Sequence, residues 1–304
     1  MAVLERIIGI ILPVFIIVGI GYGYARRRGD SVRADMTVLN RISTEVLCPL
    51  LVFTALAGKD FNFAVNGVLI LAGGLIALGS GLLAWPIARI LGYDVRSFVP
   101  AMMYNNCGNM GLPLAVLAFG ATGLPAMVAL FMACSLVYFS VGIKILESGR
   151  DGVHTSFFKF LASSMMIAMI LGILFSVAGI SLPAPLFTAL KMLGDASIPI
   201  MLFSLGIRMI DVSLKSWRIG LAGAVICPVS GLAVAWIVDG LLALTVQQRG
   251  LMYLFSALPP AVFCFMMAEY YKQESDKVAA IMMLGNLAAL VFVPVGLWIG
   301  LRVG

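Results

Sequence analysis

Long apolar stretches separated by short polar segments run through the whole chain. The first stretch, 7–24, ends in Arg26-Arg27-Arg28 and has no small-residue cleavage site, so it predicts a retained span rather than a signal peptide. A membrane-spanning helix needs about 20 mostly apolar residues. The pattern therefore predicts ten transmembrane helices, at 7–24, 36–57, 64–91, 97–119, 124–146, 158–180, 184–208, 217–244, 250–270 and 278–300.

The composition excludes soluble, disordered and fibrous proteins. Of the 304 residues 62% are apolar and 11% are charged, whereas a soluble domain has about 45–50% and about 25%. Ten spans of about 22 residues leave about 84 residues for loops and tails, so no separate soluble domain is expected. The sequence predicts an all-α polytopic membrane protein whose partner is the lipid bilayer, and no nucleic acid is expected to bind.

Basic residues predict the orientation in the membrane. Cytoplasmic loops tend to be rich in lysine and arginine. One side would hold fourteen of them, Arg26, Arg27, Arg28, Arg33, Arg89, Arg96, Lys144, Arg150, Lys159, Arg208, Lys215, Arg218, Lys272 and Lys277. The other side would hold four, Arg6, Lys59, Arg249 and Arg302. The chain is therefore expected in the cell membrane with both termini on the non-cytoplasmic side.

Two halves of the chain repeat one pattern. Arg41, Glu45, Pro49 and Phe53-Thr54 of span two match Lys191, Asp195, Pro199 and Phe203-Ser204 of span seven at a constant offset of 150 residues. Because each half has five spans, the halves have opposite orientations, as in many secondary transporters. The predicted division is a first repeat at 1–147, a short cytoplasmic link at 148–157 and a second repeat at 158–304.

Spans four and nine contain residues that interrupt helices near the middle of the bilayer. Glycine and proline make a continuous helix costly at 104–113 and at 256–260. In an inverted repeat, the half-helices that restart there bring two positive N-terminal ends together, which favours binding a carboxylate. The candidate substrate-binding residues are Asn105, Asn106, Gly108, Asn109, Gly111, Pro113, Ser256, Pro259, Pro260 and Cys264.

Two acidic residues are predicted at membrane depth. Glu45 and Asp195 each have a basic residue four positions earlier, Arg41 and Lys191, on the same helix face. A charged side chain at this depth costs about 2.5–3.5 kcal/mol to insert, so a partner or a proton is expected. Two interpretations stay open: ion pairs at an interface between helices, or proton acceptors on the substrate pathway.

No metal site or cofactor is predicted. The five cysteines, Cys48, Cys107, Cys134, Cys227 and Cys264, lie in apolar stretches without a CxxC pair or a histidine partner. The few polar residues of spans three, five and ten, among them Asn66, Ser80, Ser135 and Asn286, favour a uniporter or proton coupling over sodium coupling. No phosphate-binding loop for ATP is present.

One segment resembles a known family. Residues 106–113 read N-C-G-N-M-G-L-P, which fits the N-x-x-N-x-G-x-P pattern of the auxin efflux carrier family; that family includes plant auxin exporters and bacterial malate and malonate permeases. Residues 194–206 and 258–270 are similar to it too, and the short central link resembles the compact bacterial form.

This resemblance implies a ten-helix fold shared with bile-acid sodium symporters. Spans one, two, six and seven would form a scaffold, often a homodimer interface, and spans three to five and eight to ten a moving core. An X-shaped crossing of spans four and nine would bind the substrate carboxylate, with Asn109, Pro113, Pro259 and Pro260 at family positions. The implied function is an elevator-type secondary transporter for a small organic anion.

Other functions are compatible with parts of the same pattern. A sodium-coupled bile-acid-type symporter would use the same fold. An intramembrane aspartyl protease would need Asp94 and Asp195 together at the cut bond, although Asp94 is predicted in a loop. A channel or an anion-sensing receptor on this fold would differ from a carrier in lacking saturable flux.

Overall fold

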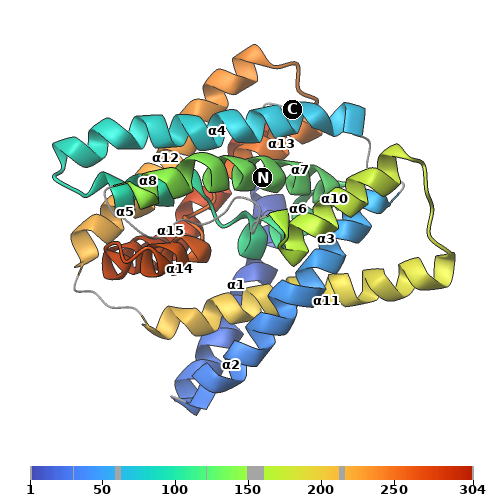
Figure 1. The fold of residues 1–304 in the computed structure, drawn as a ribbon, viewed down its shortest axis with the longest axis horizontal. Coiled ribbons are helices and arrows are strands. Elements are labelled where there is room, and N and C mark those ends of the chain that lie inside the picture. Colours follow the sequence, from blue (N-terminus) through green and yellow to red (C-terminus); the bar gives the residue numbers. More distant parts are fainter. Residues whose placement is uncertain are drawn as a thin grey trace.

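The computed structural model describes residues 2–29, 31–58, 63–120, 122–148, 161–211 and 216–302. Within these ranges the chain is helical, with short connections and no strand longer than one isolated bridge (Figure 1). The α-helices are α1 (Ala2–Arg28), α2 (Ser31–Ile42), α3 (Cys48–Ala57), α4 (Phe63–Ile90), α5 (Val95–Met103), α6 (Leu112–Phe119), α7 (Gly123–Val137), α8 (Ile143–Glu147), α10 (Ser164–Val177), α11 (Ala184–Arg208), α12 (Trp217–Leu241), α13 (Val246–Ser256), α14 (Val262–Tyr270) and α15 (Ser275–Arg302). Short π-helical and 3-10 segments are η1 (Ser43–Leu47), η2 (Cys107–Gly111), η3 (Tyr138–Gly142) and η4 (Met209–Asp211).

Seven helices in the described ranges are long and apolar enough to cross a membrane. They run over Ile7–Arg28, Met36–Ala57, Val65–Ile90, Gly123–Glu147, Ala184–Arg208, Trp217–Leu241 and Ser275–Leu301. Shorter helices occupy the other predicted spans: α5, η2 and α6 at 97–119, α10 within 158–180, and α13 and α14 at 250–270. The all-helical membrane class is supported, whereas the count of ten stays a prediction; of the predicted link 148–157 only Ser148 is described.

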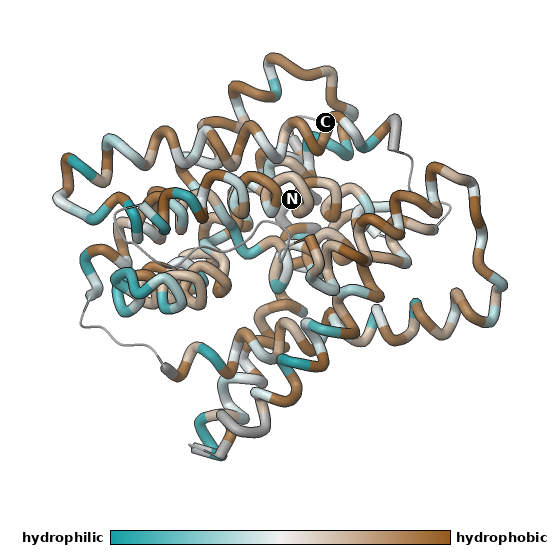
Figure 2. The backbone as a smooth tube through the Cα atoms, in the orientation of Figure 1, coloured by the Kyte–Doolittle hydropathy of each residue, from teal (hydrophilic) through white to brown (hydrophobic). Residues whose placement is uncertain are grey.

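The helices pack in two groups. In one, α11 packs against α1 and α3, and α10 packs against α3. In the other, α12 packs against α15 and α4, and α4 packs against α5 and α7. Figure 1 shows α2, α3 and α11 extending from one side of the molecule, with α4, α12 and α15 on the other. Hydrophilic residues gather toward helix ends, and the long helices are mostly hydrophobic between them (Figure 2).

Glycines permit the closest helix contacts. A Cβ atom at Gly206 of α11 would lie 1.9 Å from the Val18 carbonyl oxygen of α1. One at Gly21 of α1 would lie 2.2 Å from the Phe203 carbonyl oxygen of α11. Small residues of this kind let membrane helices approach backbone to backbone, where dispersion contacts replace the hydrophobic driving force. The α1–α11 pair therefore depends on glycine at both positions.

The loop before α5 contains a charged helix cap. Asp94 accepts hydrogen bonds from the Arg96 backbone N–H at 2.9 Å and from Arg96 Nη2 at 2.8 Å. These contacts with Arg96 hold the pKa of Asp94 below its ordinary value of 3.8. A carboxylate at this position satisfies backbone donors that the first helical turn leaves without partners.

Asp94→Ala is expected to lower the free energy of unfolding by about 1 kcal/mol, because α5 loses its cap. The contribution of the ionised carboxylate is full above about pH 4 and is lost as the pH falls through the lowered pKa. Melting temperatures of wild type and variant at neutral and acidic pH would test this. A gap that is equally large at neutral and acidic pH would contradict the electrostatic part, and Asp94→Asn separates charge from hydrogen bonding.

Candidate functional site

Two helices stop at the same place and their chains continue side by side. Helix α5 ends at Met103 and α13 ends at Ser256. The following residues pair as an antiparallel bridge between Asn105 and Pro260. The Asn106 N–H donates to the Pro259 carbonyl at 2.6 Å, and the Ala261 N–H donates to the Tyr104 carbonyl at 2.9 Å. We refer to the two paired segments, residues 104–106 and 257–261, as the crossover.

The local sequence explains why helical geometry stops here. Pro259 and Pro260 have no N–H to donate, so α13 cannot continue through them. The Asn106 and Ala261 N–H groups and the Pro259 and Tyr104 carbonyl groups find partners in the other segment, which satisfies buried backbone that would otherwise be unpaired. Helices resume on both sides, in η2 and α6 after the first segment and in α14 after the second.

Two of the predicted asparagines brace the crossover. Asn105 Nδ2 donates to the Phe255 carbonyl at 2.6 Å, at the end of α13. Asn106 Nδ2 donates to Asn286 Oδ1 of α15 at 3.1 Å, and Asn286 Nδ2 donates to the Met282 carbonyl at 2.9 Å. All three asparagines are buried. Asn105 and Asn106 therefore stabilise the crossing itself, with one hydrogen bond from each amide nitrogen.

Asn109 differs from these two asparagines. Its side chain is half-exposed and has no hydrogen-bond partner among the described residues. It lies in η2, which packs against α11, beside half-exposed Gly108. An amide offers both donors and an acceptor, so Asn109 is an accessible polar side chain three residues after the first crossover segment.

The remaining predicted residues serve packing around the crossover. A Cβ at Gly111 would lie 2.8 Å from the Leu258 side chain, and Pro113 is buried in the first turn of α6. Ser256 Oγ donates to the Met252 carbonyl at 2.7 Å, and Cys264 Sγ donates to the Tyr104 carbonyl at 3.5 Å. Neither side chain is open to a ligand, because both are buried.

Sequence reasoning missed two glycines that the crossover requires. A Cβ at Gly231 of α12 would lie 2.4 Å from the Ser256 carbonyl oxygen. One at Gly285 of α15 would lie 2.7 Å from Pro260 Cδ. A glycine inside an apolar span is the signal that could have found them, since it marks a close helix approach.

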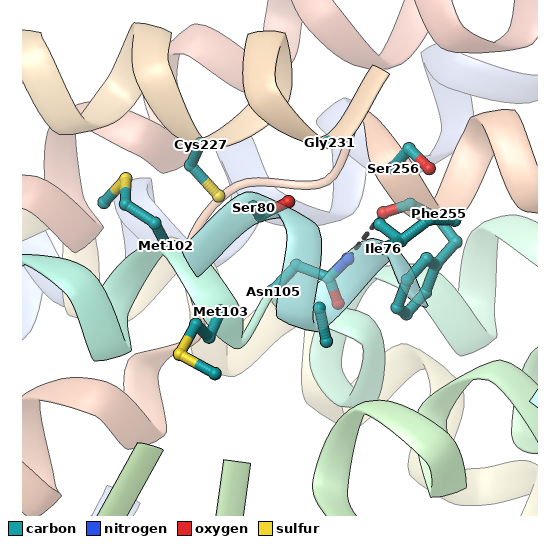
Figure 3. Close-up of a pocket in the computed structure, with 10 residues that line it drawn as sticks. Ile76, Ser80, Met102, Met103, Asn105, Cys227, Gly231, Phe255 and Ser256 are labelled. Carbon is teal, nitrogen blue, oxygen red and sulfur yellow. Dashed lines mark hydrogen bonds between the residues drawn. The ribbon is translucent and has the colours of Figure 1, made fainter. Parts of the chain in front are cut away.

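A small cavity lies beside Asn105. Its volume is about 10 Å³, and its polar lining includes Asn105, Ser80 of α4 and Ser256 (Figure 3). The Asn105 Oδ1 atom is buried and has no hydrogen-bond partner within the described residues. A space of this size holds about one water molecule.

We expect substitutions of Asn106 and Asn286 to have coupled effects on the free energy of unfolding. Asn106→Leu or Asn286→Leu alone leaves a buried amide without its partner and should cost about 1–3 kcal/mol. The double variant removes both groups, so its cost should be smaller than the sum, with a coupling of about 0.5–3 kcal/mol. Thermal or denaturant unfolding in detergent measures the cycle, and additive costs would contradict the bond.

Glu45 and Asp195, the two acidic residues predicted at membrane depth, lie on the outer surface of the chain. Arg41 Nε donates to Glu45 Oε1 at 3.1 Å, and Lys191 Nζ donates to Asp195 Oδ2 at 2.6 Å. All four side chains are about half exposed or more. Asp94 and Asp195 each have a basic partner of their own, Arg96 and Lys191, which is not the shared arrangement that a protease needs.

The described part of the chain brings no three His, Cys, Asp or Glu side chains together as metal ligands. The five cysteines are free and buried.

Comparison with known proteins identifies similar sequences over almost the whole chain. The profile of a family described as "Membrane transport protein" matches residues 6–298. An uncharacterized transporter of Methanothermobacter thermautotrophicus is 26% identical over 302 residues, covering 95% of this chain and 96% of that protein. An uncharacterized transporter of Methanocaldococcus jannaschii is 23% identical over 310 residues, covering 95% of this chain and 97% of that protein.

Proposed function

This chain belongs to the membrane transport protein family, that of the auxin efflux carriers, and we propose that it is a secondary transporter for a small organic anion. The family consists of transporters, which argues against the aspartyl protease alternative. The observation that carries the proposal is the crossover with the free Asn109 amide at its edge.

The proposed site binds the substrate carboxylate at the crossover. Helix α14 begins directly after it, and the first backbone N–H groups of a helix have no intrahelical partners. The positive end of that helix favours an anion, and the Asn109 amide adds a donor from the opposite segment. An uncharged site of this kind suits a carboxylate, because it needs no buried lysine or arginine.

The proposed mechanism is an elevator. Ten spans in two inverted repeats would place α5 with α6, and α13 with α14, as interrupted spans four and nine. Spans one, two, six and seven, which contain α1, α2, α3, α10 and α11, would be the scaffold. Spans three to five and eight to ten, which contain α4, α5, α6, α7, α8, α12, α13, α14 and α15, would be the moving core. The more extensive packing of α11 with α1 and α3, and of α12 with α15 and α4, than of helices between the two sets supports this assignment.

We assign the two exposed ion pairs to the scaffold surface. Charged side chains that face lipid at membrane depth are costly, so a second copy of the chain covering α2, η1 and α11 would shield Arg41–Glu45 and Lys191–Asp195. A scaffold homodimer follows, with both termini on the non-cytoplasmic side. The alternative role of Glu45 and Asp195, as proton acceptors, predicts a pH-gradient effect that their Gln and Asn variants abolish.

Sodium coupling is the second candidate. Asn105 and Ser80 both line one small cavity beside α4, the buried Asn105 Oδ1 atom has no hydrogen-bond partner among the described residues, and neutral oxygens can bind a hard cation. A symporter of this type would transport in proportion to the sodium gradient.

Flux of labelled malonate into proteoliposomes tests the function. Separate pH and sodium gradients identify the coupling ion, and unlabelled malate and indole acetate serve as competitors. Saturable flux supports a carrier, and acceleration by one gradient names its coupling ion. Linear, non-saturating flux would indicate a channel. Absence of flux, with no acid raising the melting temperature, would remove the organic-anion class.

A further inference from the structure

The loop that connects α14 to α15 makes three hydrogen bonds to the first half of the chain. Tyr271 Oη donates to Glu147 Oε1 at 3.3 Å, and Gln273 Nε2 donates to the Leu146 carbonyl at 2.6 Å, both at the end of α8. Ser97 Oγ of α5 donates to Glu274 Oε2 at 3.2 Å. Figure 1 shows α5, α8 and α14 on the same side of the molecule. We call these six residues the clasp: Ser97, Leu146, Glu147, Tyr271, Gln273 and Glu274.

The clasp is partly shielded from water. Tyr271 and Ser97 are buried, and the Glu274 side chain is 34% exposed. Lys277 of α15 pairs with Glu274 Oε1, which leaves Oε2 for Ser97. The Ser97 hydroxyl also lies 3.2 Å from the Asp94 carbonyl, so it is shared between two acceptors on α5 and on the loop. Hydrogen bonds to a carboxylate are stronger than those between neutral groups, so the clasp fixes the loop against α5 and α8.

A strained residue lies inside the clasp loop. Lys272 has a φ of 51°, and among the described residues it is the one non-glycine residue with a positive φ. Its N–H donates to the Glu269 carbonyl at 3.0 Å, and the Gln273 N–H donates to the Ala268 carbonyl at 2.8 Å, which ends α14. Such a conformation persists where surrounding contacts fix the backbone, and it is concentrated at functional sites. The clasp bonds of Tyr271 and Gln273, on either side of Lys272, are contacts of this kind.

Helix α14 connects the clasp to the crossover. It has nine residues, so it is about 14 Å long. At its start the Ala261 N–H donates to the Tyr104 carbonyl, and directly after its end Tyr271 joins the clasp. Both ends of the helix are therefore bound to the first half of the chain. A shift at the clasp would move the first-turn N–H groups that the proposed function assigns to the substrate carboxylate.

A second contact joins the two halves at the opposite end of predicted span nine. Gln247 Nε2 of α13 donates to Thr122 Oγ1, between α6 and α7, at 2.8 Å. Gln247 and Ser97 are 150 residues apart, which is the offset that relates spans two and seven. This contact is a single bond between neutral groups. The charged, strained version therefore belongs to the end of span nine that carries α14.

We infer that the clasp holds α14 in place from outside the crossover, with Tyr271 and Glu274 as positioning residues for the anion site. The inference rests on the proposed function for its substrate. Its structural consequence, a fixed α14, is measurable without any substrate.

Hydrogen–deuterium exchange of residues 262–270, measured by mass spectrometry in detergent, tests the clasp. Tyr271→Phe removes one bond with little change in shape, and Glu274→Ala removes another. Each should speed exchange in α14 about tenfold, because local opening of the helix no longer breaks a hydrogen bond to a carboxylate. Glu274→Gln should exchange more slowly than Glu274→Ala, since its amide oxygen still accepts from Ser97. Unchanged exchange in α14 would overturn the clasp, and so would an equal rise in every helix.

The matched control is Asp276→Ala. Asp276 is an exposed acidic residue of α15, two positions after Glu274, and has no hydrogen bond within the part of the chain that the structure describes. Its variant should exchange like the wild type in α14. A tenfold rise there would overturn the clasp, because loss of a nearby negative charge would then be enough to loosen the helix.

Transport separates positioning from stability. In proteoliposomes the malonate concentration that gives half-maximal flux should rise about three- to tenfold in Tyr271→Phe with maximal flux nearly unchanged, because the anion site is less well formed. Wild-type half-saturation despite faster α14 exchange would overturn the positioning role. Faster exchange in the variants, with no malonate flux in the wild type, would contradict the proposed substrate and not the clasp.

Discussion

Gly206→Ala is expected to destabilise the protein strongly, although it adds only a single methyl group. The added Cβ would lie 1.9 Å from the Val18 carbonyl oxygen and 2.8 Å from its carbon, both backbone atoms of α1. Since backbone cannot rotate away as a side chain can, α1 and α11 must separate. Overpacking of this kind costs about 3 kcal/mol, and the displaced helices also lose the contact that Gly21 makes with Phe203.

The measurement is the melting temperature and the monodisperse yield in detergent. Gly9→Ala is the control on α1, because a Cβ at Gly9 meets nothing within 4 Å. It should match the wild type or melt slightly higher, since alanine favours helix over glycine by about 1 kcal/mol. If Gly206→Ala also melts like the wild type, the close approach of α1 and α11 is incorrect.

Asn109→Ala is expected to abolish most transport while leaving the fold intact. A hydrogen bond to a charged group is worth about 1.5–3 kcal/mol, so flux at low substrate should fall about 10- to 150-fold. Stability should not change, because the Asn109 side chain has no hydrogen-bond partner among the described residues. Asn109→Asp should be at least as inactive, since its charge repels the substrate carboxylate.

Flux and melting temperature are measured on the same preparations. Asn40→Ala is the matched control, because Asn40 of α2 is also half-exposed and has no described hydrogen bond. It should transport at the wild-type rate. Wild-type flux in Asn109→Ala would remove this residue from the substrate site, and a large loss of stability would make it a structural residue like Asn106.

The end of α13 was open to sequence reasoning because its cause, the two prolines at 259–260, is local. Gly108, Gly111 and Pro113 lie within η2 and α6 instead, so the predicted interruption at 104–113 is limited to residues 104–106. The structure ends α5 at Met103 and α13 at Ser256, close to those residues. The two i,i+4 ion pairs follow from helical spacing in the same way.

The different roles of the three asparagines could not be predicted from the sequence. Asn105, Asn106 and Asn109 look alike in the sequence as candidate ligands. Asn105 meets the Phe255 carbonyl 150 residues away and Asn106 meets Asn286 180 residues away, which leaves Asn109 open. Without those distant partners the three could not be ranked.

The sequence by itself determined the membrane class, the family resemblance and the charges paired within one turn. Each depends on composition or on neighbours within about four residues, which helix geometry makes predictable. The tertiary structure decided which asparagine is free and which glycines lie against the backbone of another helix. These depend on how segments far apart in the chain pack against one another, and no local period encodes that packing.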